Sequence, residues 1–140
     1  MSQEVEANKL VVRAIFAKAL ANSEAGAFAA YAEADAVEHG TRGTSRFDVG
    51  SFRLALSGLA TRDINLAIED LIGESDKVVA RLTVSGISKE RFQSTNPRDF
   101  AAGFAIEHIH IFRLRSGRVT DHWYVRDELQ LLEQLGILPT

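Results

Sequence analysis

The chain has 140 residues, a size typical of one domain, and we expect a single domain spanning residues 1–140. Hydrophobic residues make up 46% of the chain and charged residues 25%, which excludes disordered, collagenous and low-complexity proteins. A formal net charge of −3 provides no broad positive field for nucleic acid, and the lack of cysteine excludes disulfides, thiol nucleophiles and thiolate metal sites.

Targeting signals are missing from the sequence pattern. No apolar run approaches the roughly 18 residues of a membrane span, and the segment Met1–Ala7 contains two Glu and no basic residue, unlike a signal peptide. We therefore expect a cytoplasmic protein that binds neither a membrane nor nucleic acid.

Helical patterns dominate the first 57 residues. The 3.6-residue period predicts a helix over residues 5–22, and Ser23 is a candidate cap for a short helix over residues 24–31. A strand is predicted over residues 34–38, a loop around Gly40–Ser45, and a third helix over residues 49–57. The apolar face predicted for the first helix comprises Leu10, Val11, Ala14, Ile15, the stem of Lys18, and Ala19.

After residue 60 the hydrophobic period changes from 3.6 to 2, which indicates strands. The predicted strands cover residues 64–71, 77–87, 100–114 and 119–125, with turns at 73–76 and 115–118 and a polar loop at 89–98. Asp127 is a candidate cap for a last helix over residues 128–135. Helices followed by successive strands predict an α+β domain with an antiparallel sheet.

The histidines suggest a site, because side chains two residues apart on a strand share a face. His108 and His110 share a face of their strand, and His122 and Tyr124 share a face of the next. If the two strands pair as a hairpin, these four side chains gather on one side, as in a small-molecule pocket. The apolar residues predicted on that face are Phe104, Ile106 and Phe112.

The opposite face of the same hairpin is too apolar for water. It carries Ile109, Ile111, Trp123 and Val125, with Trp123 expected to pack there and not to stack on a ligand. Such a face favours a homodimer formed through the sheet.

Two other interpretations of the histidines stay open. Each histidine can be a core residue satisfied by hydrogen bonds, and His108, His110 and His122 together are enough imidazoles for an open metal site. We expect no metal, because no acidic residue follows His110 at a ligand's spacing and the chain opens with helices. Phosphate-loop and nucleophile-elbow motifs are absent from the sequence.

An ordered set of short motifs resembles the SnoaL-like polyketide cyclase family of the nuclear transport factor 2-like superfamily, over about residues 8–138. The set comprises Val12-x-x-x-Phe16, Tyr31-x-x-x-Asp35-x-Val37-x-His39-Gly40, the run Glu69–Arg81, Ile111–Leu114, Gly117-Arg118-Val119-x-x-His122-Trp123 and Asp127-x-x-x-Leu131-x-x-Gln134-Leu135-Gly136.

The resemblance implies a cone-shaped α+β barrel, in which a curved antiparallel sheet wraps against the N-terminal helices around a mostly apolar pocket, and a homodimer. It implies an aldol ring closure that uses no cofactor and no metal. In that chemistry a carboxylate removes a proton next to a carbonyl, and a histidine supports the enolate oxygen.

Carrying the family's site over residue by residue places the enolate-supporting histidine at His110 and the histidine before the base at His122. The base itself falls on Tyr124, which cannot act as a carboxylate because its ordinary pKa is about 10. Asp127 matches the family's aspartate, either as a base, as a helix cap or as an orienting partner for a histidine. His39 matches a histidine at the pocket mouth, or it anchors its loop by a hydrogen bond. Phe16 is expected to be a packing residue, placed where it can line the closed end of the pocket.

We expect a cofactor-free enzyme that cyclises, isomerises or hydrates an apolar, carbonyl-bearing, polyketide-like substrate. In this hypothesis His110 donates a hydrogen bond to the oxyanion, Tyr124 is a second donor or an acid, and Asp127, His122 or His108 moves the proton. The alternative is a non-catalytic module of the same fold that only binds its ligand.

Overall fold

The computed structural model describes residues 2–20, 28–57, 62–88 and 102–136. Within these ranges the chain forms three helices and six strands. The helices are α1 (Gln3–Leu20), α3 (Val49–Ser57) and α4 (Glu128–Gln134). The strands are β1 (Ala32–Gly40), β2 (Gly43–Arg46), β3 (Arg62–Glu74), β4 (Lys77–Ser88), β5 (Ala102–Arg115) and β6 (Arg118–Arg126).

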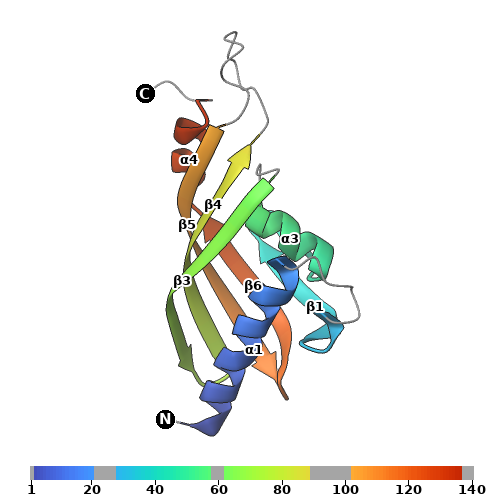
Figure 1. The fold of residues 1–140 in the computed structure, drawn as a ribbon. Helices are drawn as coiled ribbons and strands as arrows, with labels where there is room; N and C mark the ends of the chain where they lie inside the picture. The colour runs from blue at the N-terminus through green and yellow to red at the C-terminus, as the bar shows by residue number, and fades with distance from the viewer. Residues whose placement is uncertain (1, 21–27, 58–61, 89–101, 137–140) are drawn as a thin grey trace.

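The six strands form one curved sheet in the order β2-β1-β6-β5-β4-β3, with α1 and α3 on one side of it (Figure 1). Every neighbouring pair is antiparallel except β1 and β6, which run parallel. The expected α+β fold is therefore confirmed, but the sheet is mixed and not wholly antiparallel. Consecutive strands joined by tight turns must be antiparallel, whereas β1 reaches β6 only through a long connection that permits either direction.

Helix α1 begins where Ser2 caps it, since the Ser2 hydroxyl accepts a hydrogen bond from the Val5 N–H at 3.1 Å. The apolar face predicted for this helix was wrong by about one residue, because Leu10 is 67% exposed. The buried face follows the spacings of three and four residues that place side chains on one side of a helix. Its members are Val5, Asn8, Val12, Ile15, Phe16 and Ala19.

Strands β3 to β6 confirm the predicted change of period. The β5–β6 hairpin turns through Ser116 and Gly117, both with positive φ, as a two-residue hairpin turn requires. Strand β4 alternates strictly between buried and partly exposed side chains from Val78 to Ser88. This alternation directs one face of the sheet at α1 and α3.

One further prediction was wrong. Residues 43–46, predicted as part of a loop, form the edge strand β2, which pairs with β1. Helix α3 has the predicted bounds. The predicted cap Ser23, most of the helix at 24–31 and the loop at 89–98 lie outside the described residues.

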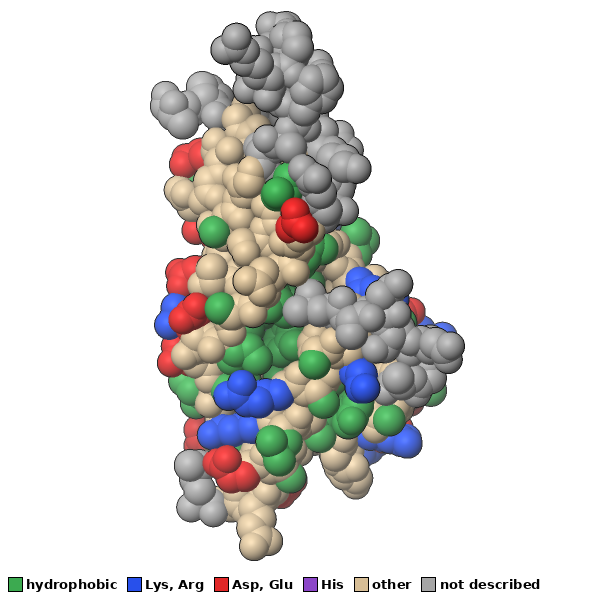
Figure 2. All heavy atoms as spheres, viewed as in Figure 1, with side chains coloured by type: hydrophobic (Ala, Val, Ile, Leu, Met, Phe, Trp, Pro, Cys, Tyr) green, Lys and Arg blue, Asp and Glu red, His purple; other side chains and the backbone are tan. Residues whose placement is uncertain are grey.

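The core fills the space between the helices and the inner face of the sheet. Phe16 from α1, Phe52 from α3 and Phe112 from β5 pack together, with ring centroids 5.4 to 6.0 Å apart. Figure 2 shows hydrophobic side chains gathered at the centre of the face that carries α1. None of the described helices is long and apolar enough to span a membrane.

Candidate active site

Three histidines form a continuous buried row across β5 and β6. His108 and His110 lie on β5, His122 lies on β6, and none is more than 2% exposed. The Nδ1 atom of His108 is 3.2 Å from the Nε2 atom of His110, and the Nδ1 atom of His110 is 2.8 Å from the Nε2 atom of His122. The predicted gathering on one face is confirmed, and each ring is hydrogen-bonded to the next.

The row ends at Glu38 on β1. Parallel pairing places Glu38 opposite His122, and the His122 Nδ1 atom lies 3.3 Å from the Glu38 Oε1 atom. Sequence reasoning missed Glu38 because the β1–β6 pairing joins residues 84 positions apart. The available signal was its spacing of two from Ala36, which is buried on the same face of β1.

The row has a single direction when Glu38 is ionised. A carboxylate only accepts hydrogen bonds, so His122 donates its Nδ1–H to Glu38 and its Nε2 atom becomes an acceptor. His110 then donates its Nδ1–H to His122, and His108 donates its Nδ1–H to His110. All three imidazoles are therefore neutral Nδ1–H tautomers, and each N–H bond points along the row toward the carboxylate.

Burial keeps these imidazoles neutral at pH 7. It lowers the pKa of His108 to about 4, with a smaller contribution from the positive charge of Arg126. It also holds the pKa of His110 well below the ordinary value. The pKa of His122 is lowered by burial as well, although the hydrogen bond to Glu38 opposes the shift.

An aromatic wall encloses the row. Phe16 and Phe52 each meet the His110 ring edge-on, at centroid distances of 5.6 and 5.8 Å. The ring centroids of Phe47 and His122 are 4.8 Å apart. Phe16 packs in the core against His110, and it is not among the residues that line the large pocket. These contacts exclude water and account for the lowered pKa values.

Tyr124 and Arg126 follow His122 on the same face of β6. Tyr124 stacks on both His110 and His122 at 5.4 Å. Burial raises its pKa above 10, opposed by the charge of Arg126 and supported by that of Glu38. Arg126 lies over the Tyr124 ring, donates a hydrogen bond to the Ala55 carbonyl and pairs with Glu128.

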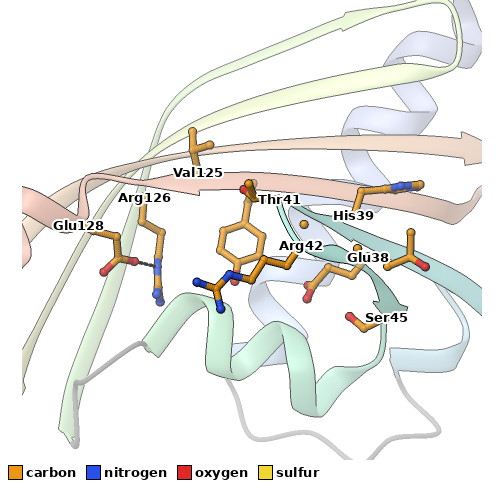
Figure 3. A pocket seen from close by; sticks show the side chains of 12 residues that line it. Glu38, His39, Thr41, Arg42, Ser45, Val125, Arg126 and Glu128 are labelled. Atoms are coloured by element: carbon orange, nitrogen blue, oxygen red, sulfur yellow. Dashed lines mark ion pairs between the residues drawn. The ribbon is translucent and has the colours of Figure 1, made fainter.

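A pocket of about 1030 Å³ opens in front of Tyr124, between the β1–β2 hairpin and the end of β6. In Figure 3 the side chains of Glu38, Arg42 and Arg126 all point toward the α3 side of the sheet. The pocket therefore brings together a phenol, a carboxylate and guanidinium groups. Its lining residues are Glu38, His39, Gly40, Thr41, Arg42, Gly43, Thr44, Ser45, Tyr124, Val125, Arg126 and Glu128.

His39 lies at the rim of this pocket, but its ring points away from the side chains of Glu38 and Arg42 (Figure 3). Its Nε2 atom is 2.8 Å from the Asp121 Oδ1 atom, and its ring stacks on Trp123 at 4.6 Å. Trp123 therefore packs on the outer face, as predicted. The structure does not bring His39 together with the other histidines, because neighbouring residues on β1 face opposite sides.

Asp127 caps α4, and its side chain accepts a hydrogen bond from the Gln130 N–H at 3.2 Å. With His108 it also lines a second pocket of about 240 Å³. The structure therefore shows the predicted helix cap and places Asp127 near the far end of the histidine row. It lies outside the set of residues that line the large pocket.

The remaining predicted pocket residues, Phe104, Ile106 and Phe112, lie on the inner face with the histidines and are at most 7% exposed. Neither the large pocket nor the small one includes them. His110 has both ring nitrogens engaged by histidines, so this arrangement leaves it no N–H for a ligand. Within the described part of the chain, no group of three or more His, Cys, Asp or Glu side chains is arranged to hold a metal.

A model of the SnoaL-like polyketide cyclase family matches residues 9–135. The chain belongs to this family. The family match covers the histidine row, Tyr124 and all of the residues that line the large pocket.

Solved structures share the fold. TsrD from Streptomyces laurentii is 24% identical, with a TM-score of 0.73 and 99% of each chain covered. AclR from Streptomyces galilaeus, a candidate hydroxylase, is 20% identical, with a TM-score of 0.75 and coverage of 97% of this chain and 89% of AclR. IdmH from Streptomyces antibioticus, a candidate polyketide cyclase, is 19% identical, with a TM-score of 0.69 and coverage of 96% of this chain and 99% of IdmH. The search of curated proteins finds no significant match.

Proposed function

We propose that this protein catalyses proton transfer on an apolar, carbonyl-bearing, polyketide-like metabolite by acid/base chemistry without a cofactor. The observation that carries the proposal is the buried row of neutral imidazoles, which ends at Glu38 in the same pocket as Tyr124. Buried titratable groups beside a pocket are typical of active sites. The family and the candidate polyketide cyclase activity of IdmH support this class of reaction.

Tyr124 is the proposed hydrogen-bond donor to the substrate. Its raised pKa keeps the phenol protonated at neutral pH, and it lines the large pocket. A donor at this place stabilises the negative charge that develops on a carbonyl oxygen when a neighbouring C–H proton is removed. The stacked rings of His110 and His122 hold the phenol in position.

In this proposal the histidines act indirectly, by supporting Tyr124. His110 bonds only to other histidines, so it holds the row together and does not touch the substrate. His122 bonds to His110 and Glu38. His108 and Asp127 both line the small pocket at the other end of the row.

The test begins with protein purified from its own source. The bound small molecules are released by denaturation and identified by mass spectrometry, with Ser45→Trp as the pocket-filling control, since Ser45 is exposed and lines the large pocket. We expect a polyketide-like compound that the control lacks.

The released compound is then incubated with the protein in D2O. We expect deuterium to enter at the carbon next to the carbonyl, and Tyr124→Phe to slow this exchange by about 100- to 1000-fold, the range for one oxyanion donor. Binding without any exchange would contradict the enzyme and support the ligand-binding module.

A further inference from the structure

Glu38 has the position of a reacting group. Its side chain is 15% exposed, lines the large pocket and points toward the α3 side of the sheet together with Arg42 and Arg126 (Figure 3). One carboxylate oxygen, Oε1, is held by the His122 Nδ1–H. Within the described residues no hydrogen bond engages the second oxygen, Oε2, so that oxygen is available to a molecule in the pocket.

The other carboxylates near the site already form hydrogen bonds or ion pairs with protein groups. Glu128 lines the large pocket but pairs with Arg126. Asp127 caps α4, and Asp121 receives hydrogen bonds from Thr120 and His39 on the outer face. Of the carboxylates in the described part of the chain, Glu38 alone joins the histidine row and the large pocket.

From this placement we propose that Glu38 is the general base of the pocket, with His122, His110 and His108 as positioning residues behind it. The proposal rests on the proposed function and adds the identity of the base. A base must reach the proton it abstracts with an atom that is free to bind it, and Oε2 meets that condition.

The proposed step uses only groups of the substrate, Glu38 and Tyr124. A substrate C–H bond next to a carbonyl breaks, its proton passes to Glu38 Oε2, and the electron pair moves onto the carbonyl oxygen, which accepts a hydrogen bond from the Tyr124 hydroxyl. The resulting enolate carbon then bonds to a second carbonyl carbon, and the new alkoxide takes the proton back from Glu38.

The imidazole row holds Glu38 throughout this step. The His122 Nδ1–H donates to Oε1 both before and after Oε2 takes the proton, so no tautomer in the row has to change. Aligned N–H donors polarise one another in a low-dielectric interior and strengthen the last bond of the row. A carboxylate held in this way needs no reorientation when it reacts.

The test uses 5-nitrobenzisoxazole, a chromogenic probe for an active-site base. Removal of its single C3–H proton forms a nitrile and breaks the N–O bond, which releases a coloured nitrophenolate. We expect the wild type to open this ring faster than acetate at the same concentration, and the isosteric Glu38→Gln to lower kcat/KM at least 50-fold. Glu33→Gln is the matched control, because Glu33 lies on the same strand and pairs with Arg118.

Two further measurements keep the test decisive. We expect added formate to restore at least a tenfold gain in turnover to Glu38→Ala, since it replaces the missing carboxylate. We also expect the Nδ1–H tautomer at His108, His110 and His122 in ¹⁵N NMR spectra of the wild type at pH 7. This readout needs no substrate.

A Glu38→Gln variant that keeps half or more of the wild-type rate would overturn the proposal, as would a wild type no faster than acetate or a row of Nε2–H tautomers. The outcome is separate from that of the proposed function. The probe reports the base whether or not a polyketide-like ligand is found, and a ligand lost from Ser45→Trp is informative whether or not Glu38 is the base.

Discussion

The imidazole of His110 shows how a residue that looks catalytic in the sequence can act through its neighbours. It is fully buried, and its two nitrogens bond to His108 and His122. In the proposed mechanism His110 therefore acts only through its neighbours in the row, which position Glu38. Removing it must also disturb the folded state, because two buried polar atoms lose their partner.

His110→Phe tests this structural share. Phenylalanine suits the aromatic surroundings but cannot form hydrogen bonds, so the His108 N–H and the His122 Nε2 atom are left unpaired. At about 1–3 kcal/mol for each unsatisfied buried group, we expect the free energy of unfolding to fall by roughly 2–5 kcal/mol in urea titrations. His39→Phe, at a partly exposed histidine on the outer face, is the control and is expected to cost about 1 kcal/mol or less. Equal stability of His110→Phe and the wild type would contradict the hydrogen bonds of His110 to His108 and His122.

The lowered histidine pKa values predict how stability depends on pH. The unfolded chain takes up protons at its histidines near pH 6.5, whereas folded His108 does so only near pH 4. The free energy of unfolding therefore falls as the pH decreases from 6.5 to 4, by about 1.4 kcal/mol per pH unit for each such histidine.

Urea unfolding at pH 7.5, 6.5, 5.5 and 4.5 measures this dependence. His108→Phe should reduce the dependence of the free energy of unfolding on pH by the contribution of one proton, about 1.4 kcal/mol per pH unit. In this variant only His110 and His122 retain a lowered pKa. A stability that stays constant between pH 6.5 and 5 would show that the histidines titrate normally in the folded protein.

At the scale of elements, the junction between β6 and α4 combines two roles in two residues, Arg126 and Asp127. Arg126 ends the strand over the Tyr124 ring, and Asp127 starts the helix by capping it. Because α4 is short, its first turn depends strongly on that cap. The same aspartate lines the small pocket beside His108.

Substitutions at Asp127 separate its cap from a catalytic role. Asp127→Ala should lower the free energy of unfolding by about 1 kcal/mol, whereas Asp127→Asn should keep most of it, since asparagine also caps helices well. With Glu38 as the base, Asp127→Asn should also retain turnover of 5-nitrobenzisoxazole. A stable Asp127→Asn that has lost this turnover would assign the base to Asp127.

At the scale of the whole molecule, the outer face of the sheet leaves apolar area in contact with water. Val125 is 67% exposed and Ile109 is 40% exposed, and a groove of about 480 Å³ runs beside them and Trp123. A second copy of the chain that covers this face stays the prediction made from the sequence.

Val125→Asp tests that prediction with little effect on the fold of one copy, because the side chain is mostly exposed. We expect light scattering to give the mass of a dimer for the wild type at micromolar concentration and that of a monomer for Val125→Asp. A wild-type monomer would exclude this face as the interface.

Local patterns were enough to predict much of this protein. The two-residue period of β4 to β6, the turn at Ser116 and Gly117, and the cap at Asp127 are local signals, and each was predicted correctly. They also placed His108, His110, His122 and Tyr124 on one face, because a hairpin fixes its own register.

Only the tertiary structure decided the rest, because it depends on contacts between distant segments. The parallel pairing of β1 with β6 brings Glu38 to His122 across 84 positions of sequence, and no local pattern fixes that register. The apolar face of α1 was misjudged by one residue because the sheet, and not the helix alone, determines which side chains are covered. The sequence by itself thus determined the fold class and the histidine row, whereas long-range strand pairing determined the carboxylate at the end of that row.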